Sequence, residues 1–207
     1  MDENIIYQGA EAKIIQSTYL GFKVVKKQRV HKRYRIREID EVLIKSRTKD
    51  EARIMALART VGVPVPIIYD VNLAAGCITF EYVKGDRVKD IFGNLSNEKR
   101  KHLCFQIGSQ IALLHNAKIV HGDLTTSNML IADQKVYFID FGLSELTSEI
   151  EAQGVDLHLL MEALESTHSF YKGSFADVFK GYCKTYTGDA KMVEKKIDEI
   201  VKRGRYR

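Results

Sequence analysis

The chain has 207 residues, of which 45% are hydrophobic and 29% charged, a composition that fits an ordered globular protein and excludes an intrinsically disordered one. Its uncharged stretches are far shorter than the roughly 20 apolar residues of a membrane-spanning helix, so we expect a cytoplasmic protein with no membrane contact. The three cysteines are widely spaced and odd in number, which gives no support for a zinc site or a disulfide framework.

The formal net charge of +5 hints at an anionic partner, and two basic segments stand out. From Lys23 to Arg37 there are eight Lys or Arg residues and no acidic residue, and the chain ends in a basic tail, 202–207. Such runs are commonly solvated surface. Because each contains a tyrosine, Tyr34 and Tyr206, we favour RNA or an acidic protein surface as the partner.

The first part of the chain predicts strands and then a helix. β-branched and aromatic residues from Ile5 to Lys27 are interrupted at Gly9 and at Leu20-Gly21, which indicates a meander of three strands. After a basic linker, a helix is expected to begin at Thr48, because apolar residues then recur at helical spacing until Gly62.

A hairpin is expected next, formed by Ile67 to Asn72 and Cys77 to Val83. Lys84-Gly85-Asp86 then reads as a connection into a second, mostly helical part. Ser96 is a suitable N-cap for a long helix that runs to about Asn116. Two short strands, Asn128 to Ile131 and Val136 to Ile139, complete the expected elements.

These elements predict an α+β fold with two lobes in a single domain, 1–207. The N-terminal lobe, about 1–83, is rich in β-structure, and the C-terminal lobe, about 84–207, is rich in helix and ends in the basic tail.

The strongest chemical signal is the segment His121-Gly122-Asp123-Leu124-Thr125-Thr126-Ser127-Asn128, followed after a predicted strand by Asp140-Phe141-Gly142. Phosphoryl transfer needs charge neutralisation more than covalent help, so two metal-binding groups and one carboxylate near the nucleophile are a natural minimum. Asp140 and Asn128 are the candidate Mg²⁺ ligands, and Asp123 is the candidate catalytic carboxylate that orients or deprotonates the nucleophile. The alternative is that these residues merely cap turns, as Asp and Asn often do.

In this order of motifs the chain resembles the protein-kinase superfamily, which implies a strand lysine and a helix glutamate at the ATP phosphates. Strand alternation places Lys26 on the face of Phe22 and Val24, and we therefore assign the catalytic, ATP-binding lysine to Lys26 rather than Lys27. Glu51 is its expected ion-pair partner. The competing interpretation is a capping box in which Glu51 bonds the backbone of Thr48.

The remaining ATP-binding residues rest on weaker patterns. The loop expected over the phosphates has one glycine in place of a GxGxxG series, and a glutamate beside phosphates is electrostatically awkward. The hinge expected to bond adenine through its backbone is 81–83. The candidates in the loop and hinge are Gly9, Ala10, Glu11, Ala12, Glu81 and Val83.

A narrower resemblance covers essentially the whole chain, with the HGDLTTSN block as its most distinctive part. Further matching segments are 8–12, Arg47 with 51–53, 139–143, 154–157 and Arg203-Gly204-Arg205. In these motifs the chain is similar to the KEOPS-complex atypical serine/threonine kinases, the PRPK family.

That resemblance implies a small Mg·ATP-dependent kinase that autophosphorylates on serine or threonine and hydrolyses ATP within the KEOPS complex. The family supports the threonylcarbamoyl modification of adenosine in tRNAs that read codons beginning with A. It implies as partners the metal-dependent threonylcarbamoyl-transferase subunit, the small KEOPS subunit and tRNA, which the basic surface and tail would contact.

The chain departs from regulated protein kinases in ways that bear on its substrate. Asp140 and Asp156 are only sixteen positions apart, which leaves no room for an extended activation segment. Gly122 and Thr125 replace an arginine and a lysine common in Ser/Thr kinases. Water or a partner residue is therefore a credible phosphoryl acceptor.

Three alternatives stay open. One is a RIO-type protein kinase that acts in ribosome maturation. A second is a small-molecule kinase of the aminoglycoside or choline type, although 207 residues leave little space for its helical substrate domain. The third is a pseudokinase that binds tRNA or partners without turnover.

Overall fold

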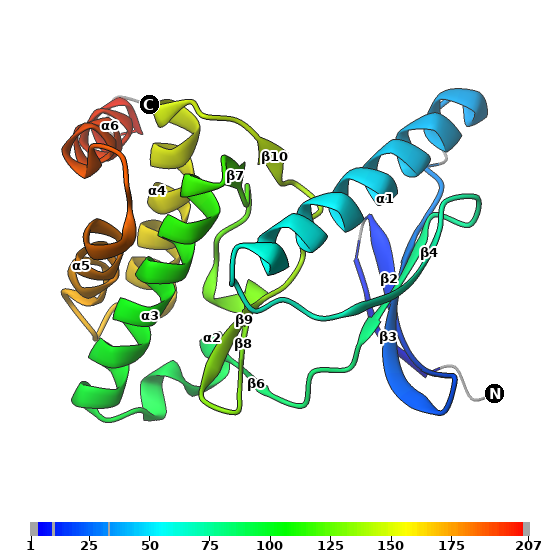
Figure 1. The fold of residues 1–207 in the computed structure, drawn as a ribbon, viewed down its shortest axis with the longest axis horizontal. Helices are drawn as coiled ribbons and strands as arrows, with labels where there is room; N and C mark the ends of the chain where they lie inside the picture. Colours follow the sequence, from blue (N-terminus) through cyan, green and yellow to red (C-terminus); the bar gives the residue numbers. More distant parts are fainter. Residues whose placement is uncertain (1–3, 10, 33, 205–207) are drawn as a thin grey trace. The chain divides into compact units, whose positions relative to one another are not determined.

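The structure is a computed structural model that describes residues 4–9, 11–32 and 34–204. The chain divides into two compact units (Figure 1): unit 1 comprises Met1–Ala56 and Pro66–Lys84, and unit 2 comprises Leu57–Val65 and Gly85–Arg207. The expected connection at Lys84-Gly85-Asp86 therefore coincides with the passage from one unit to the other. The interpretation of both units as one domain stays a prediction.

Unit 1 is a five-stranded antiparallel sheet in the order β1-β2-β3-β5-β4, accompanied by one long helix. The expected three-strand meander and the hairpin that follows the helix are both confirmed. Lys27 on β3 lies opposite Ile14 on β2 and Ile78 on β5, so this lysine is in the middle of the sheet. The elements are β1 Asn4–Gln8, β2 Ala12–Tyr19, β3 Phe22–Arg29, α1 Arg37–Thr60, β4 Ile68–Asn72 and β5 Cys77–Glu81.

The expected start of the helix at Thr48 is wrong, because α1 begins at Arg37. The Thr48 hydroxyl donates to the Ile44 carbonyl within the helix at 2.6 Å and caps nothing. The apolar residues in the first turns of α1, such as Ile39 and Val42, are exposed. No buried apolar face marks the helix there.

A buried carboxylate fixes the start of α1 instead. Asp40 is 1% exposed and accepts from the Lys32 backbone N–H at 3.0 Å, from His31 at 3.0 Å and from Arg35 at 3.3 Å. The backbone N–H of Lys32, together with the two side chains, holds the pKa of Asp40 below its usual range. The basic segment is thus partly folded around Asp40 and is not simply a solvated linker.

Unit 2 combines helices with two small sheets, one in the order β6-β8-β9 and one formed by β7 and β10. The N-cap at Ser96 is confirmed, since its hydroxyl accepts from the Lys99 N–H and α3 ends at Asn116. The two short strands appear within one residue of their expected positions. The elements are β6 Asp86–Arg87, α2 Val88–Ile91, η1 Phe92–Asn94, α3 Asn97–Asn116, β7 Ile119–Val120, η2 Thr126–Asn128, β8 Met129–Ala132, β9 Lys135–Phe138, β10 Glu145–Leu146, α4 Ile150–Thr167, α5 Ser174–Thr185 and α6 Ala190–Gly204.

The core of unit 2 forms where α3 packs against α5. Helix α3 turns the apolar residues Leu103, Ile107 and Ile111 inward at helical spacing. The segment after α1 joins this unit because the Phe138 N–H donates to the Pro64 carbonyl at 2.9 Å. No helix of the described residues is long and apolar enough to cross a membrane.

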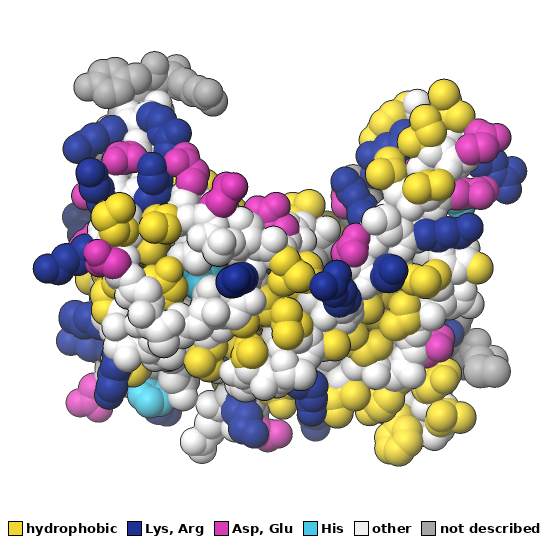
Figure 2. Space-filling model, turned by 45° about the horizontal axis from the view of Figure 1, so that its top comes forward, with side chains coloured by type: hydrophobic (Ala, Val, Ile, Leu, Met, Phe, Trp, Pro, Cys, Tyr) yellow, Lys and Arg dark blue, Asp and Glu magenta, His cyan; other side chains and the backbone are white. Residues whose placement is uncertain are grey.

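Lys and Arg side chains do not form one continuous patch on the face shown in Figure 2, where Asp, Glu and hydrophobic side chains lie among them. The end of α6 carries Lys202 and Arg203, and Arg203 donates to Glu151 on α4 at 2.6 Å. The remaining residues of the expected basic tail, 205–207, lie outside the described residues.

Close contact between α3 and α5 generates a stability prediction. A Cβ at Gly108 would overlap the Val178 carbonyl on α5, so we expect Gly108→Ala to lower the free energy of unfolding by about 2 kcal/mol. Gly204→Ala at the end of α6 is the control, because no heavy atom of the described residues lies within 4 Å of the position that its Cβ would take. Urea unfolding measures both. Equal stability of the two variants would contradict this account of the α3–α5 contact.

Candidate phosphotransfer site

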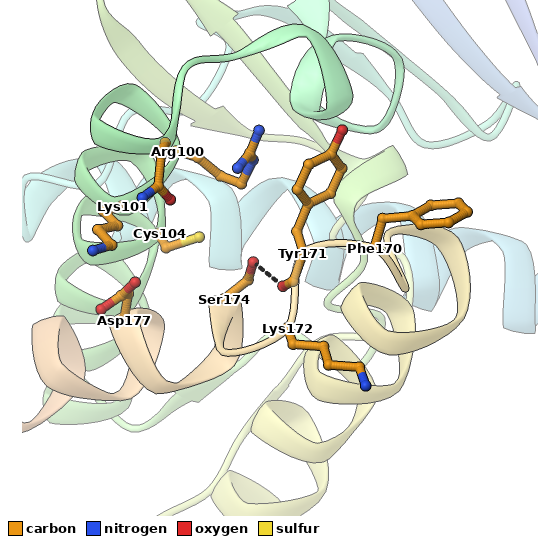
Figure 3. A pocket seen from close by; sticks show the side chains of 9 residues that line it. Arg100, Lys101, Cys104, Phe170, Tyr171, Lys172, Ser174 and Asp177 are labelled. Atoms are coloured by element: carbon orange, nitrogen blue, oxygen red, sulfur yellow. Dashed lines mark hydrogen bonds between the residues drawn. The ribbon is translucent and has the colours of Figure 1, made fainter.

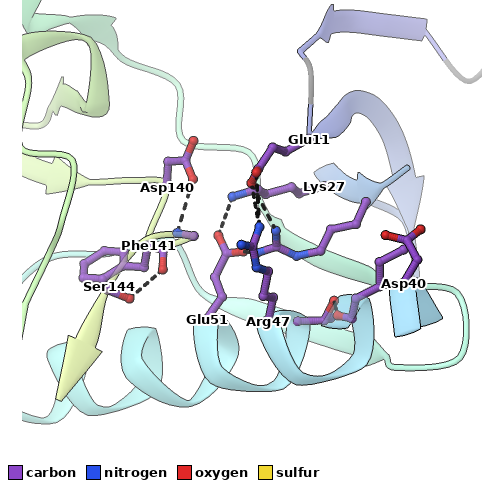
Figure 4. A network of polar contacts seen from close by, with 12 residues as sticks. Glu11, Lys27, Asp40, Arg47, Glu51, Asp140, Phe141 and Ser144 are labelled. Atoms are coloured by element: carbon purple, nitrogen blue, oxygen red, sulfur yellow. Dashed lines mark hydrogen bonds and ion pairs between the residues drawn. The ribbon is translucent and has the colours of Figure 1, made fainter. Parts of the chain in front are cut away.

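An ion pair joins β3 to α1, and its lysine is Lys27. The Lys27 ammonium lies 2.6 Å from Oε1 of Glu51, and the Arg29 guanidinium lies 2.7 Å from Oε2. The Glu51 side chain is only 1% exposed, so this carboxylate depends on both cations for compensation. Figure 4 shows Glu51 rising from α1 toward Lys27.

The assignment of this ion pair to Lys26 is therefore wrong. Lys27 and Arg29 are two residues apart and reach the same carboxylate, so the face of β3 that meets α1 carries odd-numbered residues. Lys26 shares a strand face with Phe22 and Val24, which are 60% and 0% exposed, so apolar residues on that face do not mark the side that meets α1. The competing capping box is excluded as well, because Thr48 lies inside α1.

The connection between β1 and β2 is held by its glutamate. The Gly9 N–H donates to the Ala12 carbonyl at 3.0 Å, and Ala12 is buried at the start of β2. Glu11 accepts from the Arg47 guanidinium at 3.1 and 3.2 Å. Ala10, the remaining candidate of this loop, lies outside the described residues. The contacts show that Glu11 has cationic partners in unit 1 to neutralise it.

The expected hinge follows β5. Glu81 exchanges hydrogen bonds with Ile67, donating through its N–H at 2.8 Å and accepting through Oε2 at 3.1 Å. The Tyr82 N–H donates to the Lys23 carbonyl at 3.3 Å, and Val83 is half-buried. Adenine binding by Glu81 and Val83 stays a prediction.

In unit 2 the structure brings together Asp123 and Asn128. The Asn128 amide donates to Oδ2 of Asp123 at 2.8 Å and to the Asp123 carbonyl at 2.9 Å. Both donor contacts orient the amide so that its oxygen is the group left to serve as a ligand. The backbone carbonyl of Asn128 accepts a hydrogen bond from the Ile139 N–H at 3.0 Å, which ties this loop to the residue that precedes Asp140.

Asp140 has a left-handed backbone with φ of 62°, a region that non-glycine residues seldom occupy. Its Oδ1 accepts from the Gly142 N–H at 3.3 Å, and Phe141 between them is buried. Such strain persists where the surroundings enforce it, and it often marks a functional position.

Mg²⁺ prefers oxygen ligands, and the Asp140 carboxylate and the Asn128 amide oxygen fit that preference. These two groups could hold the metal, while the Asn128–Asp123 hydrogen bond orients the candidate catalytic carboxylate. The chemistry of the donor set therefore suits an ion that neutralises phosphate charge.

Asp156 on α4 supports the candidate site in a way that the sequence pattern does not reveal. It is fully buried and accepts from the backbone N–H groups of His121 at 2.8 Å and Gly122 at 2.9 Å. His115 contributes a third contact at 3.2 Å. Asp156 thus anchors the backbone that leads directly into Asp123. The sequence shows only the spacing between Asp140 and Asp156. The anchoring role becomes apparent from the burial of the Asp156 carboxylate and its hydrogen bonds to backbone N–H groups.

Gly122 is required by the same backbone. Its φ is 80°, and a Cβ at this position would overlap the Leu143 carbonyl. An arginine there, as in many kinases, would be incompatible with this approach.

His121 supports the loop and is held neutral. Its Nδ1 accepts from the Asp123 N–H at 3.3 Å, so Nε2 carries the proton that is donated to the Ile139 carbonyl at 3.1 Å. Burial lowers the pKa of His121, although the nearby carboxylate of Asp156 opposes this shift. The imidazole also packs on the Phe141 ring, 4.6 Å between centroids.

A separate cavity of about 310 Å³ lies in unit 2 beside the start of α5 (Figure 3). The Arg100 guanidinium stacks on the Tyr171 ring at 3.7 Å and donates to the Leu95 carbonyl at 2.6 Å. Burial raises the pKa of the adjacent Cys104 thiol to about 12. The described residues that line this cavity include none of the predicted site residues.

The anchoring role of Asp156 is testable by a change that keeps its shape. Asp156→Asn removes the charge and turns an N–H₂ toward one of the backbone donors, so we expect the free energy of unfolding to fall by about 2–4 kcal/mol. Asp189→Asn is the control, since the Asp189 carboxylate also accepts a backbone N–H, from Lys191 at 3.0 Å, but at an exposed position. Chemical denaturation compares them. A stability loss no greater than that of the control would refute the anchor.

The neutral state of His121 predicts a pH dependence. Because the folded-state pKa lies below the unfolded value of about 6.5, the unfolded chain binds more protons and stability is lost as the pH falls below that value. We expect His121→Gln to lose less stability than the unsubstituted chain between pH 7.5 and 5.5, as measured by urea unfolding. Identical acid dependence of the two proteins would show that His121 does not contribute.

Comparisons with known proteins identify the family. A family model for the RIO domain matches residues 7–176. The chain is 49% identical over 211 residues to the KEOPS complex subunit Bud32 of Pyrococcus abyssi (strain GE5 / Orsay), covering 98% of this chain and 96% of that protein. It is also 39% identical to a probable bifunctional tRNA threonylcarbamoyladenosine biosynthesis protein of Methanobrevibacter smithii, but spans only 37% of that longer relative.

Solved structures show the fold. The Rio2 kinase of Chaetomium thermophilum, solved as an ADP/Mg²⁺-phosphoaspartate complex, has a TM-score of 0.67 at 16% identity, over 97% of this chain and 70% of that one. WaaP in complex with acyl carrier protein has a TM-score of 0.64 at 12% identity, over 96% and 88% of the two chains. The expected protein-kinase-like fold and the resemblance to the KEOPS kinases are thus confirmed, and the chain belongs to the RIO-type atypical kinases as a homologue of the KEOPS subunit Bud32.

Proposed function

We propose that the chain is the Mg·ATP-dependent kinase and ATPase subunit of a KEOPS complex and supports threonylcarbamoyladenosine formation in tRNA. The observation that carries this proposal is the 49% identity to a KEOPS subunit over nearly the full length of both chains. The longer relatives are likewise named for tRNA threonylcarbamoyladenosine biosynthesis.

The unit 1 residues have roles in nucleotide binding. Lys27, held by Glu51, takes the place of Lys26 as the residue proposed to contact the α and β phosphates of ATP. The Gly9–Ala12 loop covers the phosphates. Glu81 and Val83 bond adenine through their backbone.

The unit 2 residues have roles in the transfer step. Asp140 and Asn128 bind Mg²⁺, which neutralises charge on the phosphates when it is present. Asp123 accepts the proton of the attacking hydroxyl or water, or orients it, and its hydrogen bond from Asn128 sets that orientation.

Water is the favoured phosphoryl acceptor. Between Asp140 and the start of α4 at Ile150, the chain forms only the short strand β10. This segment offers little surface for an extended peptide, so ATP hydrolysis and autophosphorylation suit the site better than phosphorylation of many proteins.

The proposed partners follow from the relatives. In the bifunctional relatives, a homologue of this chain is part of a longer protein named for tRNA threonylcarbamoyladenosine biosynthesis. We therefore take the threonylcarbamoyl-transferase subunit to be a partner of this chain, together with the small KEOPS subunit. Lys202 and Arg203 at the end of α6 are candidates for tRNA contact. Such a complex works in the cytoplasm.

A second candidate function is favoured by the match to the RIO domain, namely a RIO-type kinase that acts in ribosome maturation. A kinase with that function would either phosphorylate a protein or hydrolyse ATP in association with ribosome precursors. Neither activity would be stimulated by a KEOPS transferase. A pseudokinase requires no turnover at all. The following experiment separates all three.

We expect the purified chain to release phosphate from Mg·ATP, and the release to rise on addition of the KEOPS transferase subunit and tRNA. Lys27→Ala and Asp140→Ala should each lower the rate on the order of 100-fold, because they remove charge stabilisation of the transferred phosphoryl group. Lys26→Ala is the matched control and should stay within a few-fold of the unsubstituted chain. Free phosphate and labelled protein are measured in parallel.

Full turnover by Asp140→Ala would overturn the site. Loss of turnover in Lys26→Ala, with Lys27→Ala active, would restore the first assignment of the lysine. Labelling of other proteins without stimulation by transferase and tRNA would favour the ribosome-linked kinase, and absence of any turnover would favour the pseudokinase.

A further inference from the structure

The Lys27–Glu51 pair is one end of a longer chain of charges within unit 1. Arg29 contacts Glu51 through Nη2 at 2.7 Å and Glu11 through Nη1 at 3.9 Å. Arg47 on α1 contacts Glu11 at 3.1 Å. Figure 4 shows Glu11 and Arg47 directed toward one another beside the Lys27–Glu51 pair. Cations and carboxylates therefore alternate from β3 to the β1–β2 connection.

Arg29 is the centre of this network. Its side chain is 5% exposed, and it directs two different nitrogens to two carboxylates on separate elements, α1 and the β1–β2 connection. Backbone contacts reinforce the link, because the Val30 N–H donates to the Glu11 carbonyl at 3.1 Å. The planar fork of arginine permits such bridging, whereas a lysine would supply a single charged nitrogen.

We propose that Arg29 is a positioning residue that fixes the phosphate-covering connection to the Lys27–Glu51 pair through Glu11, with Arg47 as the second support. The inference rests on the proposed ATP-binding function and assigns to ion pairs a task that a glycine-rich backbone performs in other kinases. Glu11 is thereby a structural anchor of the loop, and its charge is neutralised before phosphates arrive.

Electrostatics give Arg29 a second task. When phosphates bind the Lys27 ammonium, Glu51 shares that cation with a ligand that is negatively charged like itself. A carboxylate that is 1% exposed is costly without compensation. Arg29 keeps Glu51 charged, paired and oriented in that state. We therefore expect Arg29 to matter for nucleotide binding as well as for folding.

The test uses the more exposed end of the network, where substitutions are compatible with folding: Glu11 is 47% and Arg47 38% exposed. We expect Glu11→Gln and Arg47→Met each to raise the Kd for Mg·ATP about fivefold at an unchanged thermal midpoint. The double variant should be no weaker than the weaker single variant, since both changes break the same anchor. Titration calorimetry on the full chain measures Kd.

Conservative changes at the two arginines should behave differently. One nitrogen of Arg47 makes both contacts with Glu11, so Arg47→Lys should restore affinity to within twofold of the unsubstituted chain. Arg29→Lys should not, because two nitrogens serve two carboxylates there. Lys180→Met, which removes the exposed pair with Asp177 in unit 2, is the control and should leave Kd unchanged.

The outcomes distinguish the inference from the function on which it rests. Unchanged Kd in Glu11→Gln and Arg47→Met, or additive losses in the double variant, would overturn the anchor while leaving ATP binding intact. Failure of the unsubstituted chain to bind Mg·ATP would overturn the proposed function and the inference with it. Coupled losses, with rescue by Arg47→Lys, would establish the anchor.

Discussion

Burial of carboxylates is the constraint on which the structure depends. Glu51 in unit 1 and Asp156 in unit 2 are both nearly inaccessible to water, and each must be compensated where it lies. Glu51 is matched by two cations from β3, and Asp156 by two backbone N–H groups and an imidazole. An uncompensated charge in these places would cost several kcal/mol. The need to compensate Glu51 fixes the position of Lys27 on β3, and the need to compensate Asp156 fixes the backbone that leads to Asp123.

The same constraint shapes the basic segment. Its cations pair with particular acids, Arg35 with Asp40 and Arg29 with Glu51, so the net charge of the chain says little about which surface is open to an anionic partner. At the other end of the chain, Arg203 pairs with Glu151 through exposed side chains. Such a pair is weak and readily exchanged for a phosphate.

Much of the fold could be predicted from local pattern. Glycine breaks delimit the meander, Ser96 caps α3, and the HGDLTTSN and DFG segments flank the paired strands β8 and β9. These features depend on residues close in the sequence. The start of α1 could not be predicted, because it depends on Asp40 and its contacts with residues upstream and not on an apolar face.

The candidate site divides along the same line. Asp123 and Asn128, five positions apart in one motif, are joined as the sequence suggests, whereas the choice between Lys26 and Lys27 depends on which face of β3 meets α1. That face is decided by tertiary contact, because both faces of β3 carry buried residues, Val24 on the face of Lys26 and Arg29 on the face of Lys27. Likewise, the awkward charge of Glu11 becomes explicable only beside Arg47, 36 residues away in sequence.

The central proposal is that Asp140 and Asn128 hold the metal of a metal–nucleotide complex and that Lys27 contacts its phosphates. The most direct measurement is a crystal structure of the chain with a non-hydrolysable ATP analogue and Mn²⁺, whose anomalous scattering locates the metal. The account predicts metal coordinated by the Asp140 carboxylate and the Asn128 amide oxygen, with Lys27 in contact with the phosphates. A nucleotide bound elsewhere, or phosphates held by Lys26 with no metal at Asp140, would contradict it.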